Sequence, residues 1–243
     1  MNILITDVVD PLLLKLLDNN NLSYEYNLDD SENAILKYIN QFQGLIVRNR
    51  LKIDETFLKK SQNLKFIARY GSGMEAIDTK AAEKFNIRCF NSGQGNANSV
   101  GEHALGMLMC LFHNINQSAT QLKNFIWERE LNRGVELEGK TIGIIGYGNT
   151  GCSLAKKIEN FGCRILTYDK YKSGFGKNNI EECNIKTIYR ECDIISFHIP
   201  LSEETKYFFD KNFIEKMEKP FYLINTSRGD VVSNADLIKG LKT

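Results

Sequence analysis

Short apolar runs alternate with segments of helical periodicity along most of the chain. Runs typical of buried strands lie at 2–7, 44–48, 64–70 and 87–90, and helical patterns lie between them at 11–19, 31–39 and 78–85. A second block has strand-like runs at 141–146, 164–169, 192–199 and 221–226. This alternation predicts the α/β class, with two doubly wound parallel sheets covered by helices.

A small, polar stretch with two glycines, at 91–97, separates the two blocks and is typical of a hinge. We therefore expect two domains, residues 1–95 and residues 96–243. One long helix is expected from about Asn98 to Lys123, because apolar residues recur there at helical spacing. A polar connector at 129–140 precedes the second block.

Composition narrows the class of protein. The 243 residues are 42% hydrophobic and 25% charged, with a formal net charge of +1, so no basic footprint for nucleic acid is expected. The apolar runs fall short of the ~20 residues that a membrane span requires. Six cysteines form no CxxC pair, and three histidines give no metal spacing. We expect reduced thiols, a cytoplasmic location, and no metal, membrane or nucleic-acid partner.

A glycine-rich turn follows the apolar run at 141–145. Gly146, Gly148 and Gly151 form the pattern GxGxxG, and a helical pattern comes directly after them. The first glycine permits a tight turn, the second lets backbone approach a pyrophosphate, and the third lets helix and strand pack closely. The free N–H groups at the start of the helix attract phosphate. The pattern indicates a dinucleotide site.

Asp169 ends the next strand-like run, at the distance expected for a carboxylate that holds a ribose hydroxyl pair. Its charge would repel the extra phosphate of NADP, which favours NAD, whereas Lys170 and Lys172 nearby act in the opposite direction. The alternative interpretation is a structural glycine turn with a surface aspartate.

Several motifs in series resemble those of the D-isomer-specific 2-hydroxyacid dehydrogenases. They lie at 134–151, 168–169, 193–205 and 224–232, and N-terminal signatures at 47–50, 68–78 and 95–109 extend the resemblance over nearly the whole chain. Among members, the chain looks most similar to the D-3-phosphoglycerate dehydrogenases. The resemblance implies a flavodoxin-like substrate lobe, a Rossmann NAD-binding lobe and an active-site cleft between them.

The resemblance also implies roles for particular residues. Asn149 and Thr150 would line the pyrophosphate of NAD, and Asp169 would hold the adenosine ribose. His198, Ile199, Pro200 and Thr205 would border the cofactor, with Thr226 and Ser227 on the nicotinamide side. Arg228 matches the catalytic arginine of the family.

The expected chemistry explains an arginine at position 228. Hydride transfer at a 2-oxo acid places negative charge on the carbonyl oxygen. A guanidinium stays protonated and donates from a planar fork, so it can hold the carboxylate and stabilise that charge. The alternative is a salt bridge at a strand end, which the surrounding motif makes less favoured.

The substrate lobe carries a second glycine loop. By resemblance, the backbone N–H groups of Gly71, Ser72 and Gly73 would hold the substrate carboxylate, and glycines suit such an anion-binding nest. The alternative is an ordinary strand-to-helix turn. Asn96 matches a family asparagine near the substrate, with an Asx turn at the hinge as the alternative.

Arg48 and Arg50 indicate the substrate. If the strand continues through them, their spacing points both side chains the same way, which suits a phosphate dianion. A solvated basic edge is the alternative. The leading hypothesis is therefore NAD-dependent oxidation of the 2-hydroxyl of 3-phospho-D-glycerate, a step of serine biosynthesis. A reductase of glyoxylate, hydroxypyruvate or another D-2-hydroxyacid is the runner-up.

The histidines complicate the enzyme hypothesis. The family's proton donor is a histidine held by a carboxylate, and neither His198 nor His103 or His113 matches it. The resemblance implies a further segment that supplies this pair. We therefore expect this chain to bind NAD with very low turnover, and a non-catalytic NAD-binding regulatory protein remains an alternative. A homodimer through the cofactor lobe, at the long helix after Asn98, is also expected.

Overall fold

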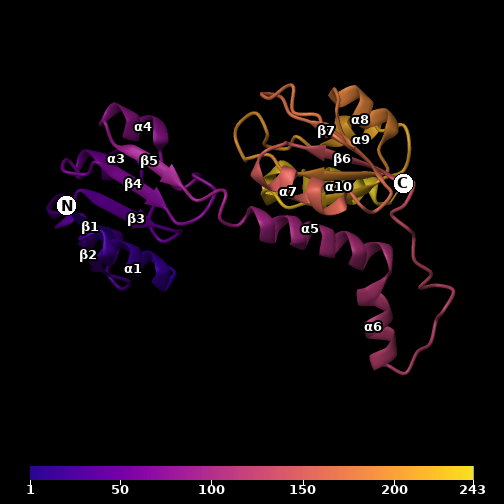
Figure 1. The fold of residues 1–243 in the computed structure, drawn as a ribbon, viewed down its shortest axis with the longest axis horizontal. Helices are drawn as coiled ribbons and strands as arrows, with labels where there is room; N and C mark the ends of the chain where they lie inside the picture. The colour runs from indigo at the N-terminus through magenta and orange to yellow at the C-terminus, as the bar shows by residue number, and fades with distance from the viewer. Residues whose placement is uncertain (243) are drawn as a thin grey trace. The chain divides into compact units, whose positions relative to one another are not determined.

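The computed structural model describes residues 1–242, which form two compact units, the first from Met1 to Asn96 and the second from Ala97 onward. Each unit contains one five-stranded sheet in which every pairing is parallel. Helices connect the strands (Figure 1). The predicted α/β class with two parallel sheets is confirmed.

The first unit has the strand order β2-β1-β3-β4-β5, which is the flavodoxin-like order. Its strands are β1 (Asn2–Ile5), β2 (Ser23–Tyr26), β3 (Gly44–Val47), β4 (Phe66–Arg69) and β5 (Arg88–Asn91). Its helices are α1 (Pro11–Asn19), α2 (Glu32–Ile35), a 3-10 turn at Ile39–Gln41, α3 (Glu55–Lys59) and α4 (Thr79–Lys84).

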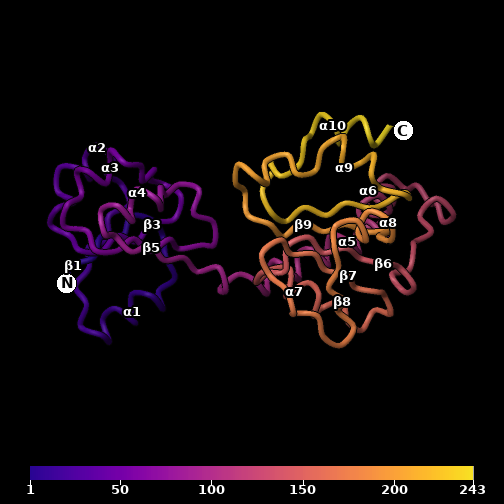
Figure 2. Tube along the Cα trace, turned by 90° about the horizontal axis from the view of Figure 1, so that it is seen from above, coloured from indigo at the N-terminus to yellow at the C-terminus, as the bar shows by residue number. Residues whose placement is uncertain are grey.

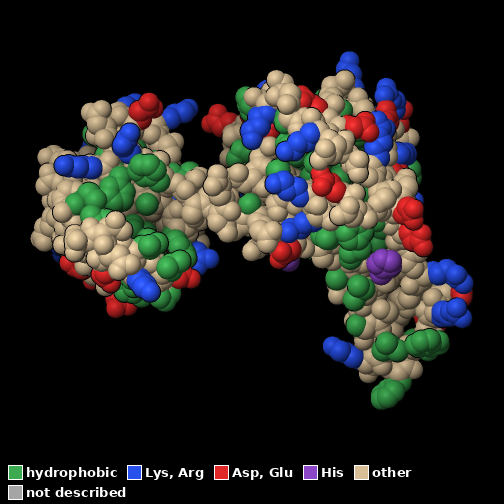
Figure 3. All heavy atoms as spheres, viewed as in Figure 1, with side chains coloured by type: hydrophobic (Ala, Val, Ile, Leu, Met, Phe, Trp, Pro, Cys, Tyr) green, Lys and Arg blue, Asp and Glu red, His purple; other side chains and the backbone are tan. Residues whose placement is uncertain are grey.

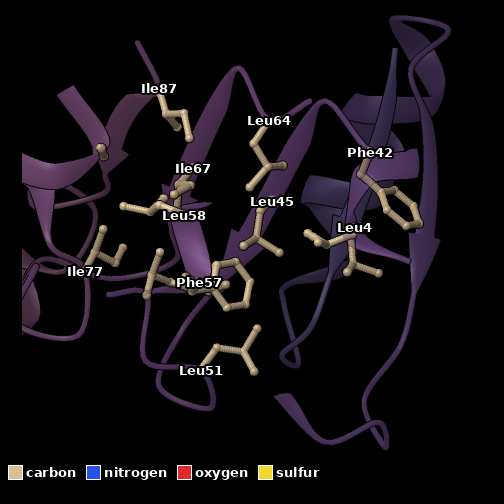
Figure 4. Close-up of a cluster of buried hydrophobic side chains, with 14 of the residues drawn as sticks. Leu4, Phe42, Leu45, Leu51, Phe57, Leu58, Leu64, Ile67, Ile77 and Ile87 are labelled. Carbon is tan, nitrogen blue, oxygen red and sulfur yellow. The ribbon is translucent and has the colours of Figure 1, made fainter. Parts of the chain in front are cut away.

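Polar side chains fix where the helices of the first unit begin. Asp10, Ser31, Asp54 and Asp78 each accept a hydrogen bond from a backbone N–H in the first turn of the helix that follows. Such N-caps stabilise a helix by about 0.5–2 kcal/mol each. One face of the sheet packs on a buried cluster that includes Leu45, Phe57 and Ile67 (Figure 4).

The second unit has the strand order β10-β9-β6-β7-β8. Its strands are β6 (Thr141–Ile145), β7 (Arg164–Tyr168), β8 (Ile180–Glu182), β9 (Ile194–Phe197) and β10 (Tyr222–Asn225). Its helices are α5 (Ala97–Phe112), α6 (Ile115–Lys123), α7 (Asn149–Ile158), α8 (Ile185–Glu191), α9 (Lys211–Lys216), a 3-10 turn at Gly229–Val231 and α10 (Asn234–Gly240). Figure 2 follows the chain through them. Counted from β6, this is the Rossmann order.

The prediction of one continuous helix after Asn98 is wrong. The helix ends at Phe112, and Asn114 has a φ of 50°, a left-handed conformation that asparagine tolerates better than most residues. The returning chain packs at this point, because the N–H of Val135 donates to the Phe112 carbonyl over 2.9 Å. The break lets α6 leave the direction of α5 (Figure 1).

Three further elements differ from the sequence prediction. The helical pattern at 31–39 forms only the short α2 and a 3-10 turn. Strands β2 and β8 were not predicted, and each lies at the edge of its sheet. Edge strands need no continuous apolar run, because only one side of the strand pairs and much of the surface is exposed. Among the described residues, no helix is long and apolar enough to cross a membrane.

Candidate functional site

The register of the second sheet brings four strand ends to one edge. Ile145 of β6 pairs with Tyr168 of β7 and with Phe197 of β9, and Phe197 pairs with Asn225 of β10. The residues that follow these strands therefore share the carboxyl edge of the sheet. They are Gly146, Asp169, His198 and Thr226. Strand order reverses between β6 and β9, and ligands of open α/β sheets bind outside such a switch point.

The three glycines of the turn have three different surroundings. Gly146 has a φ of 96°, and a Cβ there would lie 2.6 Å from the His198 carbonyl oxygen. A Cβ on Gly151 would lie 2.0 Å from the carbonyl oxygen of Gly146, so helix α7 packs directly on the turn. A Cβ on Gly148 would meet nothing within 4 Å. The turn is therefore closely packed at Gly146 and Gly151 and open to solvent at Gly148, as a pyrophosphate-binding turn requires.

Helix α7 begins at this turn without a side-chain cap. Gly148 is its N-cap residue, so no side-chain oxygen accepts from the first-turn N–H groups. Asn149 is exposed and Thr150 is half-buried at the start of the helix. Uncapped N–H groups and the positive end of the helix dipole attract a phosphate. The residues present thus fit a dinucleotide.

The Asp169 carboxylate is held by three backbone groups. One oxygen accepts from the N–H of Tyr147 over 2.9 Å, and the other accepts from Tyr171 and Lys172 over 3.0 and 3.1 Å. An ionised carboxylate has about four acceptor sites, so with three occupied about one remains for a ribose hydroxyl group. The aspartate is therefore fixed in orientation beside the turn.

A pocket of about 430 Å³ joins these groups. Its lining contains seven of the residues predicted to hold the cofactor: Gly146, Gly148, Asp169, His198, Ile199, Pro200 and Thr205. The others predicted for the cofactor lie behind it or beside it. Gly151 supports Gly146, and Thr150 and Thr226 contact His198, while Ser227 accepts from the Ile199 N–H over 3.0 Å.

His198 is buried and connects three elements through hydroxyl groups. Its Nε2 lies 2.9 Å from the Ser196 hydroxyl, and its Nδ1 lies 3.2 Å from the hydroxyls of both Thr150 and Thr226. Burial lowers the pKa of His198 to about 4, so the ring is neutral at physiological pH. It therefore orients its neighbours and is poorly suited to donate a proton to substrate.

Arg228 follows β10 at the same carboxyl edge of the second sheet. Its Nη1 donates to the Ser227 carbonyl over 2.9 Å, and its own carbonyl accepts from the Asn225 side-chain amide over 3.0 Å. The loop from Asn225 to Arg228 is thus tied to itself. The guanidinium of Arg228 therefore lies against the Ser227 carbonyl.

The first unit has its own polar carboxyl edge. Val47 of β3 pairs with Arg69 of β4, and Arg69 pairs with Asn91 of β5. Strand β3 ends at Val47, so the assumption that the strand continues to residue 50 is wrong. The chain turns instead, because the Asp7 carboxylate accepts from the N–H groups of Arg48 and Asn49 over 2.9 and 3.1 Å.

Arg50 lies beyond the end of β3, so the spacing expected for two strand residues does not apply to Arg48 and Arg50. The guanidinium of Arg50 donates to the carbonyl oxygens of Leu28 and Asn27, and its Nε is buried without a partner among the described residues. The side chain therefore holds the turn at residues 27 and 28. The pairing of Arg48 with Arg50 as a phosphate clamp is not what this geometry favours.

Arg69 is a residue that the sequence analysis missed. Its Nη2 donates to the Asn49 side-chain oxygen over 2.8 Å, and its Nη1 fills the place of a Cβ on Gly71, 1.7 Å from that position. Gly71 has a φ of 153°, which explains the glycine. The sequence could have pointed to Arg69, because this charged residue stands near the end of an apolar run, just before the glycine loop.

The glycine loop of the first unit is held from β5. The Asn91 amide donates to the Ser72 carbonyl over 2.8 Å, and the N–H of Ser92 donates to the Gly71 carbonyl over 2.9 Å. Gly73 is half-buried in this loop, and Asn96 is exposed just before α5. Among the described residues, no group of three or more metal-ligating side chains gathers.

Comparison with known proteins gives the family. Residues 105–243 match the D-isomer specific 2-hydroxyacid dehydrogenase, NAD binding domain. Hydroxypyruvate reductase of Thermotoga maritima is 34% identical over 206 residues, 85% of this chain and 67% of that protein. Human D-3-phosphoglycerate dehydrogenase is 30% identical over 246 residues, 99% of this chain but 46% of that protein.

A solved structure has the same fold. D-lactate dehydrogenase from Aquifex aeolicus, complexed with NAD and lactic acid, superimposes with a TM-score of 0.87 at 26% identity. The match covers 99% of this chain and 73% of that one. This chain thus spans part of the length of its relatives, about half in the case of the phosphoglycerate dehydrogenases. NAD is the cofactor of the matched domain, and the chain belongs to the D-isomer specific 2-hydroxyacid dehydrogenase family.

Proposed function

We propose that the protein acts as an NAD-dependent oxidoreductase that oxidises the 2-hydroxyl of 3-phospho-D-glycerate, a step of serine biosynthesis. The observation that carries the proposal is the shared carboxyl edge of β6, β7, β9 and β10. It brings the open glycine turn, the fixed Asp169 and the loop of Arg228 together. The first 96 residues would bind substrate, and the remainder would bind NAD.

NAD would lie across the carboxyl edge of the second sheet, with each part of the cofactor at the residues that the sequence motifs predict. The pyrophosphate would lie on the N-terminus of α7 at Asn149 and Thr150, and the adenosine ribose at Asp169. Ile199, Pro200 and Thr205 would border the cofactor, and the fixed hydroxyls of Thr226 and Ser227 would face the nicotinamide side. Bound NAD would accept the hydride that leaves C2 of the substrate.

Arg228 would hold the substrate carboxylate and stabilise charge on the 2-oxygen. A planar guanidinium can donate to both groups at once, and hydrogen bonds between ionised partners are roughly twice as strong as neutral ones. In the first unit, the N–H groups of Ser72 and Gly73 would supply donors for a carboxylate, with Asn96 nearby, while the N–H of Gly71 already donates to the Arg69 carbonyl over 2.8 Å. The neutral, buried His198 would keep Thr150 and Thr226 in position.

The substrate phosphate would be held by Arg48 together with Arg69. Arg48 follows β3 and Arg69 ends the neighbouring strand β4, and Asn49, next to Arg48 in the chain, accepts from Arg69 through its side-chain oxygen. Arg50 would contribute to phosphate binding only indirectly, because its guanidinium holds the turn at residues 27 and 28. Two arginines on one edge would favour a phosphorylated acid over a plain one.

The test is the binding preference of the NAD-loaded protein. Isothermal titration with 3-phospho-D-glycerate and with D-glycerate should show tighter binding of the phosphorylated acid. We expect Arg48→Ala and Arg69→Ala each to reduce that preference about ten-fold, as the loss of a charge-assisted hydrogen bond predicts. Lys52→Ala removes a neighbouring exposed cation and should leave the preference unchanged.

An unchanged preference in both arginine variants would show that the phosphate assignment is wrong. A second candidate is a reductase of hydroxypyruvate or a similar acid, which the 34% identity to the Thermotoga enzyme supports. Equal binding of the two acids by the unmodified protein would favour this candidate. Binding of NAD without binding of either acid would favour a regulatory NAD-binding protein. The neutral His198, which is poorly suited to donate a proton, would agree with that role.

We also propose a homodimer through α5, α6 and the loop that follows. Helix α6 has no buried residue, and hydrophobic side chains gather along it and its loop (Figure 3). The apolar arm consists of the exposed residues Leu111, Ile115, Leu122, Phe125, Ile126, Trp127 and Leu131. Phe125 is 100% exposed and Trp127 is 76% exposed. Such a patch marks an interaction surface. A second copy of the chain would bury it.

The double substitution Phe125→Asp with Trp127→Asp should convert a dimer into a monomer. Each aspartate places a charge on the surface that a second copy would bury, which costs several kcal/mol when unpaired. Light scattering after gel filtration measures the mass. Leu12→Asp changes a leucine of the first unit that is 60% exposed and should leave a dimer. If the unmodified protein is already a monomer, the dimer proposal is wrong.

The proposal includes a location in the cytoplasm. All six cysteines are free in the structure, and none of the spacings is that of a metal or redox motif. Free thiols of this number suit a reducing compartment.

A further inference from the structure

Two loops meet at the rim of the 430 Å³ pocket. One follows β7 and carries Lys170 and Tyr171, and the other follows β9 and carries Glu204. The Lys170 ammonium forms an ion pair with one oxygen of Glu204, and the Tyr171 hydroxyl donates to the other. All three residues line the pocket together with Asp169.

The second lysine of the rim is also engaged. Lys172 donates from its Nζ to the Tyr147 carbonyl over 3.1 Å. The sequence left open whether Lys170 and Lys172 would attract an additional phosphate beside Asp169. In the structure each lysine already has an acceptor, and Glu204 supplies the only carboxylate that the described residues pair with Lys170.

We infer that Glu204 is a specificity-determining residue that favours NAD over NADP by occupying Lys170. The inference rests on the proposed position of the adenosine ribose at Asp169. The 2′-phosphate of NADP carries between one and two negative charges and would approach the rim at this point. A lysine without Glu204 could pair with that phosphate. With Glu204 present, the phosphate meets two carboxylates and a lysine already neutralised.

The charge states at the rim agree with this arrangement. The hydrogen bond from Lys170, followed by that from Tyr171, lowers the pKa of Glu204. The same contact with Glu204 raises the pKa of Lys170. Glu204 is therefore ionised and Lys170 is protonated throughout the neutral range.

The test compares the affinities of NADH and NADPH by isothermal titration. We expect Glu204→Gln to lower the ratio of the NADPH Kd to the NADH Kd about ten-fold, the low end of the effect of a hydrogen bond to a charged group. Glu203→Gln removes the same charge from the adjacent exposed residue and should leave the ratio within about two-fold, since solvent screens a charge that makes no contact with Lys170.

A second substitution shows whether Lys170 carries the effect. Adding Lys170→Met to Glu204→Gln should return the ratio toward that of the unmodified protein, and high salt should weaken the gain of the single variant. The inference is overturned if Glu204→Gln leaves the ratio unchanged, if Glu203→Gln changes it equally, or if the gain survives Lys170→Met. If the unmodified protein binds no NADH, the proposed cofactor site itself is wrong.

Discussion

A Gly148→Val substitution is expected to lower the affinity for NADH at least about 100-fold while the protein stays folded. Gly148 has a φ of −84° and a ψ of −157°, close to the extended region that residues with side chains adopt, and a Cβ there meets nothing within 4 Å. The added methyl groups would fill the space in front of the uncapped N-terminus of α7. The pyrophosphate could then no longer reach those N–H groups, whose hydrogen bonds to a charged ligand contribute about 1.5–3 kcal/mol each.

Isothermal titration with NADH measures the affinity, and circular dichroism on heating measures Tm. Gly106→Val is the matched control, because a Cβ on this glycine of α5 also meets nothing within 4 Å. The control should bind NADH within about two-fold of the unmodified protein. Undiminished NADH binding by the Gly148→Val protein would contradict the placement of the cofactor at this turn.

A substitution at Gly151, three residues after Gly148, is expected to lower the stability of the protein. Gly151→Ala places a Cβ 2.0 Å from the Gly146 carbonyl oxygen, a backbone atom that cannot move without shifting β6 or α7. Overpacking of this kind costs about 1–3 kcal/mol or more. In a chain of this size, a loss of about 3 kcal/mol lowers Tm by roughly 6–12 °C.

Thermal unfolding followed by circular dichroism measures this loss. Gly148→Ala adds the same methyl group to the same turn, in open space, and should lower Tm by no more than about 4 °C, the effect of a poorer N-cap residue. The account of close packing between α7 and β6 would be wrong if Gly151→Ala unfolded at the temperature of the unmodified protein.

The buried elements could be predicted from the sequence, because burial on both faces requires continuous apolar runs. Strands β3 and β6 are such runs, and each is flanked by polar or glycine residues. The edge strands β2 and β8 could not be predicted this way. The break at Asn114 depends on the distant chain at Val135, which packs against the end of α5.

The cofactor motif could be predicted because its spacing is local. Gly146 and Gly151 lie close together along the chain, and Asp169 follows the next strand, whose last residue Tyr168 pairs with Ile145. The contacts of Arg50 and of the pocket rim could not be predicted in the same way. Arg50 turns to carbonyl oxygens near residue 28, and Glu204 reaches Lys170 from another loop. Both contacts depend on which loops meet at the edge of a sheet. The spacing of residues along the chain does not determine which loops meet.

Titration of the unmodified 243-residue protein with NADH tests the central claim most directly. We predict saturable binding of one cofactor per chain, with a Kd in the micromolar range, and a loss of at least about ten-fold when Asp169→Ala removes the carboxylate beside the turn. The absence of saturable binding at NADH concentrations up to about 1 mM, the upper end of ordinary enzyme KM values, would contradict the account.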